Sequence, residues 1–311
     1  MAGAVRTLGY VTRYHHVDVF TAVPYAGNSL AVFVDPPPLG PAQLAAITRE
    51  LRHFESIFVE TAGGTAGDVC TVRARVFDLA GELEFAGHPV LGAAAVLHRR
   101  AGVPAGATRS WNFELPARTV RVDTTGHPAG HVAAILDQGR PETVLARAPL
   151  DRAGVAAAVG LRRGDLDSTL PLAIVSIGLR YLIVPVRRGA LDRARIAHPD
   201  FEGYLAELGA QFAYLIDAAA LEGRHWNNDG VVEDVATGSA AGCVAAYLLD
   251  HGRLASGTTA HLAQGRHVGR PSFLAIAAYG APGAVQRVVV GGDVAEVATG
   301  ELRVLPPAAS A

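Results

Sequence analysis

The feature that most constrains the fold is a pair of matching apolar segments, each introduced by glycine. The first reads GHPVLGAAAVLH from Gly87, and the second reads GSAAGCVAAYLL from Gly238, 151 positions later. After their opening residues, neither segment carries a strongly polar side chain until its last turn. A helix that is apolar on every side is a buried one. We therefore expect two buried central helices, each surrounded by sheet.

The same spacing recurs elsewhere in the chain. Gly27 in VPYAGNSLAVF and Gly178 in VSIGLRYLIVP are also 151 positions apart. The segments LRHFESIFVE and LGAQFAYLID look alike at an offset of 157, which matches Leu51 with Leu208. Small-residue helices can resemble one another by chance, but a shared offset in two separate places favours an internal duplication.

Local patterns predict the elements of each half. VDVFTAVPYAGNSLAVFVD is typical of two strands around a turn, and PAQLAAITREL of a helix that starts at proline. SIFVE and TVRARVFDLAGELEF are predicted to be strands. We expect an α+β fold of two pseudo-symmetric halves, each a mixed β-sheet curled around a central helix. The expected domains are residues 1–130, completed by a C-terminal strand at 290–305, and residues 131–289.

Composition excludes several classes of protein. Half of the 311 residues are hydrophobic and the net charge is only −2, so no basic field indicates nucleic acid or an anionic membrane. The N-terminus lacks a signal-peptide pattern, and no apolar stretch is long enough to span a membrane. Two cysteines exclude a disulfide framework and a cysteine-based zinc site. We expect a soluble, cytoplasmic protein.

The two helix starts are candidate ligand sites. A helix N-terminus presents unpaired N–H groups and a partial positive charge, which favours an anion. His88 stands at the first start, while Ser239 and Thr237 stand at the second, just after Asp234. Each of these residues alone is more often structural, for example as a helix N-cap. At corresponding positions of a repeat, they predict a small carboxylate bound in a cleft between the two helix starts.

Glu55 marks a difference between the halves. It lies between the apolar residues Phe54 and Ile57, and its counterpart at the 157 offset is Phe212. A solvent-facing strand glutamate is the ordinary alternative. A carboxyl group among apolar neighbours has a raised pKa, so Glu55 is a candidate general acid and base.

These residues also carry a family resemblance. VDVFTAVPYAGNSLAVF, ELRHFESIFVE, ELEFAGHPVLGAAAVL, VVEDVATGSAAG and QGRHVGRPS occur in this order along nearly the whole chain. Together they resemble the PhzF-like phenazine biosynthesis proteins. The resemblance implies the diaminopimelate epimerase fold, in agreement with the two halves expected above.

The resemblance further implies a cofactor-free and metal-free isomerase that moves a proton between carbons of a small unsaturated cyclic amino or carboxylic acid. It also implies a role in secondary metabolism, such as antibiotic biosynthesis, and a homodimer. By motif, the catalytic residues would be Glu55, His88 and Asp234. The chain departs from the family pattern at Val235, where proline is usual, and at Phe54, where the phenazine enzyme has serine. The candidate substrate-binding residues are Asn28, Gly87, His88, Thr237, Gly238 and Ser239.

Other activities fit the sequence less well. Related epimerases and racemases use a cysteine at each helix start, whereas Cys70 lies in a predicted strand and Cys243 lies one turn inside the second helix. A serine hydrolase would need the G-x-S-x-G pattern that TGSAAG lacks. The sequence contains no H-E-x-x-H motif, which would indicate a metal enzyme. A cofactor-independent epimerase and a non-catalytic carboxylate-binding protein remain the alternatives.

Overall fold

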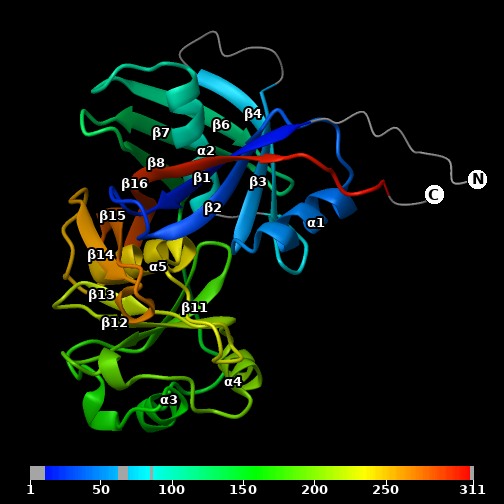
Figure 1. Ribbon diagram of the computed structural model, residues 1–311. Coiled ribbons are helices and arrows are strands. Elements are labelled where there is room, and N and C mark those ends of the chain that lie inside the picture. Colours follow the sequence, from blue (N-terminus) through cyan, green and yellow to red (C-terminus); the bar gives the residue numbers. More distant parts are fainter. Residues whose placement is uncertain (1–10, 62–68, 85–86, 309–311) are drawn as a thin grey trace, which may run out of the picture. The chain divides into compact units, whose positions relative to one another are not determined.

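The computed structural model describes residues 11–61, 69–84 and 87–308 (Figure 1). The chain forms two compact units and has an α+β fold. Unit 1 comprises residues 1–24, 29–134 and 294–311, and unit 2 comprises residues 25–28 and 135–293. The predicted domain boundaries at 130/131 and 289/290 lie four residues from two of these divisions. None of the helices in the described residues is long and apolar enough to span a membrane.

Unit 1 is a mixed sheet with the order β1-β2-β3-β4-β6-β7-β8, in which β1 also pairs with the last part of β16 and β5 pairs with β4. The β2–β3 and β4–β6 pairs are parallel. Its strands are β1 (Thr12–Val19), β2 (Asn28–Val34), β3 (Glu55–Glu60), β4 (Val69–Asp78), β5 (Glu82–Leu83), β6 (Thr108–Glu114) and β7 (Thr119–Gly126), together with the first residues of β8 (Val132–Gly139) and the last part of β16 (Ala284–Leu302).

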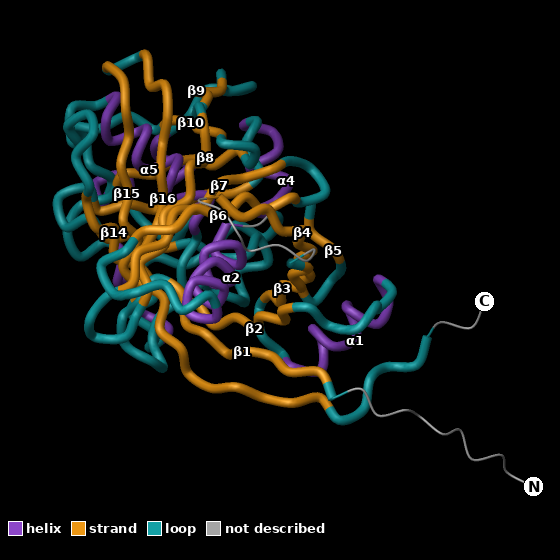
Figure 2. The backbone as a smooth tube through the Cα atoms, turned by 90° about the horizontal axis from the view of Figure 1, so that it is seen from above, coloured by secondary structure: helices purple, strands orange, loops and turns teal. Residues whose placement is uncertain are grey.

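Two helices cover opposite faces of this sheet, α1 (Pro41–Leu51) and α2 (Gly87–Arg100). Successive strand residues point to opposite faces. Phe33 and Phe58 accordingly pack with α1, while Leu30 faces α2. Figure 2 shows β2 and β3 between the two helices. The helix α2 is the predicted buried one and contacts β1, β3, β6 and β7.

Close packing explains a glycine inside α2. A Cβ atom at Gly92 would lie 2.4 Å from Leu30 Cδ2 and 3.1 Å from Val19 Cγ2. Only a residue without a side chain lets the helix approach the strands this closely. The small residues of the sequence segment therefore serve to bring α2 onto the sheet.

Unit 2 repeats this plan. The first part of β16 leads into the order β15-β14-β13-β12-β11-β10-β9, and β11–β12 is parallel. The buried helix α5 (Gly238–Asp250) contacts β10, β11 and β15, while the other face carries α3 (Arg152–Ala158) and α4 (Phe201–Leu208). The strands are β9 (Glu142–Val144), β10 (Ala173–Ser176), β11 (Arg180–Pro185), β12 (Phe212–Asp217), β13 (Glu222–Arg224), β14 (Ala260–Gln264) and β15 (Ser272–Ala281).

The register of the strands confirms the predicted repeat. In unit 1 Leu30 is opposite Glu55, and in unit 2 Tyr181 is opposite Phe212, both in parallel pairs. These residues are related by the offsets of 151 and 157. Both ends of β3 and β12 also differ by 157, and the starts of α2 and α5 by 151. The two halves are therefore pseudo-symmetric in structure as well as in sequence.

Candidate active site

The start of α2 brings a carboxylate and an imidazole together. Glu55 is the first residue of β3, and His88 lies in the first turn of α2. His88 Nδ1 is 3.4 Å from Glu55 Oε2, and the two side chains are 9% and 20% exposed. The distance exceeds an ordinary N–H···O bond of about 2.9 Å. An imidazolium ion at this distance would stabilise an ionised carboxylate by charge attraction.

The surroundings of Glu55 differ between its two sides. Ile57 is fully buried, whereas Phe54 is 39% exposed. Of the two apolar neighbours seen in the sequence, only Ile57 is thus withdrawn from water. Among the residues that the structure describes, none outside the adjoining chain and the helix's own backbone would lie within 4 Å of a Cβ atom at Gly87. The space beside the helix start is open at this residue.

The start of α5 is ordered by a network around Asp234. Thr237 Oγ1 donates to Asp234 Oδ2 at 2.6 Å, and Gln264 Nε2 donates to Thr237 Oγ1 at 3.0 Å. Asp234 Oδ1 accepts from the Ala236 N–H at 3.3 Å. Thr237 precedes the helix but makes no side-chain cap, because its hydroxyl is directed to Asp234. Asp234 therefore shapes the turn that leads into α5.

Two further candidates lie at this end of unit 2. Asn28 is buried, and its Nδ2 donates to the Ala236 carbonyl at 3.2 Å, so it holds the same turn. Ser239, in the first turn of α5, is partly exposed, and its Oγ lies 2.7 Å from the Tyr181 hydroxyl. The first turn of a helix leaves amides without intrahelical acceptors. Gly238 and Ser239 contribute to that turn, so the arrangement can bind an anionic oxygen.

The sequence reasoning missed Gln264 and Tyr181. Gln264 opens the segment QGRHVGRPS, to which the family resemblance assigns no role. Its side chain bridges Tyr214, Thr237 and the Asp234 carbonyl. Tyr181 is the 151-offset counterpart of Leu30. The side-chain contacts of Gln264 and Tyr181 produce no periodic pattern in the sequence. The offset of 151 is the one sequence signal for Tyr181, because it matches this residue with Leu30, the strand neighbour of Glu55.

The cysteines lie away from the helix starts. Cys70 is in β4 and Cys243 is inside α5, both buried. Burial raises the pKa of the Cys243 thiol to about 12, so it is not a thiolate at neutral pH. We expect Cys70→Ala and Cys243→Ala to keep the wild-type turnover and to lose about 1 kcal/mol of stability each. Steady-state kinetics and urea unfolding test this, and loss of turnover in a folded variant would revive a thiol mechanism.

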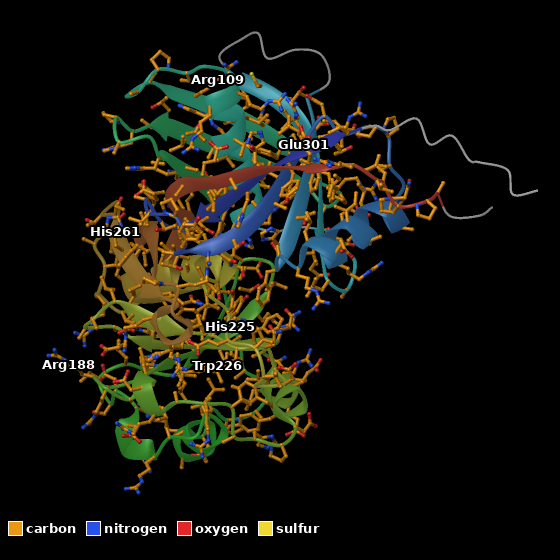
Figure 3. All side chains as sticks on the ribbon, in the orientation of Figure 1. Arg109, Arg188, His225, Trp226, His261 and Glu301 are labelled. Carbon is orange, nitrogen blue, oxygen red and sulfur yellow. The ribbon has the colours of Figure 1, made fainter. Side chains whose placement is uncertain are left out.

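His225 gives the protein a pH-dependent stability. It is buried, and burial lowers its pKa, while the nearby Asp234 and the bond to the Ala213 carbonyl oppose this shift. Below about pH 6.5 the unfolded chain binds more protons at this residue than the folded protein, so stability falls as pH falls. His225→Gln should flatten the loss between pH 7 and pH 5 in urea unfolding. His261→Gln, at an exposed residue labelled in Figure 3, is the control, and His225→Gln should flatten the slope more than this variant does.

The protein is therefore a duplicated α+β protein with polar side chains at the start of each buried helix. The chain belongs to the family described as phenazine biosynthesis-like protein, whose model matches residues 17–300. A trans-2,3-dihydro-3-hydroxyanthranilate isomerase of Pseudomonas fluorescens is 34% identical over 90% of this chain and 95% of that protein. With curated relatives named as isomerases at this identity, the chain is an isomerase of the PhzF type.

Solved structures agree with the predicted fold. A predicted epimerase of Pseudomonas aeruginosa is 44% identical with a TM-score of 0.82, over 94% of this chain and 99% of that one. A hydroxyproline epimerase of Agrobacterium vitis, 14% identical with a TM-score of 0.57 over 96% and 94% of the two chains, shares the fold. The expected epimerase-like fold is confirmed.

Proposed function

We propose that the protein moves a proton between two carbons of a small unsaturated cyclic amino or carboxylic acid, with Glu55 as the acid and base. The observation that carries the proposal is the 3.4 Å approach of His88 Nδ1 to the Glu55 carboxylate. A carboxylate that acts as a general base must be within reach of the substrate, and partial burial shields it from water. Glu55, at 20% exposure, meets this need.

One carboxyl group both removes and returns the proton. The ionised Glu55 takes a proton from one carbon of the substrate, and the double bonds shift as the charge delocalises over the ring. The protonated Glu55 then returns the proton to another carbon, so that the enzyme ends as it began. A protonated His88 would stabilise the Glu55 carboxylate while that carboxylate is ionised.

The second helix start supplies binding. We propose that the first turn of α5, with Thr237, Gly238 and Ser239, binds the substrate carboxylate, supported by the helix dipole. Asn28 and Asp234, which hold the preceding turn, would shape this site, and Asp234 would accept from an amino or hydroxyl group of the ring. Gly87 leaves room for the ligand beside His88.

An isomerase with one base fits better than an epimerase with two. Exchange of a proton between opposite faces of one carbon needs an acid and a base on either side. The repeat counterpart of Glu55 is Phe212, which cannot transfer a proton. The counterpart of His88 is Ser239, which is bonded to a hydroxyl rather than to a carboxylate. The asymmetry of the two halves therefore supports a single acid–base residue.

The named activity of the relatives suggests the first substrate to test. Trans-2,3-dihydro-3-hydroxyanthranilate, incubated with the protein in D₂O, should take up deuterium at a ring carbon and change its absorption as the double bonds move. Mass spectrometry and NMR measure both. Saturable binding without any exchange, across this and related unsaturated cyclic acids, would instead favour the carboxylate-binding protein.

The proposal also includes the assembly and location of the protein, which we expect to be a homodimer in the cytoplasm.

A further inference from the structure

A hydroxyl pair stands at the start of α5. The Tyr181 Oη and Ser239 Oγ atoms are 2.7 Å apart. Tyr181 is 2% exposed, whereas Ser239 is partly exposed. Of the two residues, Ser239 is therefore the one that solvent reaches. Its hydroxyl is accordingly the better placed of the two to contact a ligand at the helix start.

The position of the tyrosine hydroxyl is set by packed rings. Tyr181 lies 5.5 Å from the ring of Phe212 and 5.6 Å from the ring of His225, measured between centroids. His225, labelled in Figure 3, is itself fixed, because its Nδ1–H donates to the Ala213 carbonyl at 2.9 Å. Burial keeps this imidazole neutral by lowering its pKa. The phenol has therefore little freedom to turn away from Ser239.

Comparison of the repeats shows what this pair replaces. In unit 1 the residue at the helix start, His88, has the Glu55 carboxylate of β3 as its partner. In unit 2 the place of Glu55 is taken by Phe212, and the polar partner comes instead from Tyr181 on the neighbouring strand, β11. The acid–base pair of one half thus corresponds to a pair of neutral hydroxyls in the other. Such a pair suits hydrogen bonding to an anion rather than proton removal.

We propose that Tyr181 is a positioning residue that orients the Ser239 hydroxyl toward the substrate carboxylate. The Tyr181 O–H donates to Ser239 Oγ, and the Ser239 O–H is thereby directed outward as a donor. A phenol is the more acidic of the two hydroxyls and the better donor. A chain of hydrogen bonds ending on an anion polarises each member. The opposite direction would present a serine lone pair to the carboxylate, which repels it.

This inference rests on the proposed carboxylate site, and a double-mutant cycle tests it. The probe is 3-hydroxyanthranilate, a fully aromatic acid that has no proton to shift, with its Kd measured by calorimetry. Tyr181→Phe should raise the Kd about three- to tenfold, the loss of one hydrogen bond. Ser239→Ala should raise it at least as much. If Tyr181 acts through Ser239, the double variant should bind no more weakly than Ser239→Ala alone.

Tyr247→Phe is the matched control. This tyrosine is also buried in unit 2, and its hydroxyl donates to the Pro171 carbonyl at 2.7 Å. Both Tyr→Phe variants should lower the unfolding temperature similarly, but only Tyr181→Phe should change the Kd. Additive effects of Tyr181→Phe and Ser239→Ala, an unchanged Kd in Tyr181→Phe, or no saturable binding by the wild-type protein would each overturn the inference. The Glu55→Gln exchange assay uses a different ligand and a different readout, so it judges the proposed acid–base function separately.

Discussion

Glu55→Gln is expected to lower the rate of deuterium exchange into the substrate at least about 100-fold, while folding is retained. The amide keeps the size of the side chain and its place near His88, but it cannot accept a proton from carbon at neutral pH. General base catalysis is worth roughly 10²–10⁴ in rate, so the loss should be of this order. The measurement is exchange by mass spectrometry at saturating substrate, with binding followed separately by calorimetry.

Glu60→Gln serves as the control for Glu55→Gln. Glu60 is the last residue of the same strand, β3, and is exposed, so the same chemical change is made away from the helix start. Its exchange rate should equal that of the wild-type protein. If Glu55→Gln exchanged as fast as Glu60→Gln on a substrate that both bind, Glu55 would be an ordinary strand residue. A different base would then have to be sought.

The sequence predicted the repeat because the repeat is recorded in local constraints. Gly27 and Gly178, matched at an offset of 151, both adopt left-handed backbone conformations, with φ of 63° and 108°. Glycine takes up such angles without the steric cost that a Cβ imposes. Gly92 of α2 is needed for close approach to the strands, and a Cβ atom at Gly242 of α5 would collide with Gln138 and Ile177. Each requirement selects residue types at fixed spacing, so the pattern is visible in one sequence.

The contacts within the site could be predicted only in part. The sequence placed His88 and Ser239 at helix starts and singled out Glu55 by its difference from Phe212. It did not reveal that the Thr237 hydroxyl turns to Asp234 instead of capping the helix, because both are ordinary uses of a threonine there. The hydrogen-bond partner of a hydroxyl depends on strand register and on residues that are distant in the sequence. A single sequence does not specify these distances.

A buried ion pair beside the site is the second place where a large effect is expected. Arg224 Nη2 and Nε lie 2.6 and 2.9 Å from the two carboxylate oxygens of Glu233, and the side chains are 11% and 7% exposed. The guanidinium also donates to the carbonyls of Leu191 and Ala194 and lies 4.3 Å from the ring of Trp226. Arg224 thus ties β13 to the segment that carries Asp234.

Glu233→Gln should lower the free energy of unfolding by about 3 kcal/mol or more, because it leaves the Arg224 charge buried without its counter-ion. Glu222→Gln is the control. Glu222 pairs with Arg266, whose side chain is 57% exposed, and an exposed pair contributes at most about 1 kcal/mol. Urea unfolding compares the two variants. In the double variant Arg224→Met with Glu233→Leu, both charges are removed and much of the lost stability should return. If Glu233→Gln cost no more than Glu222→Gln, water would have to reach Arg224, and the ion pair would not be what holds Asp234 in place.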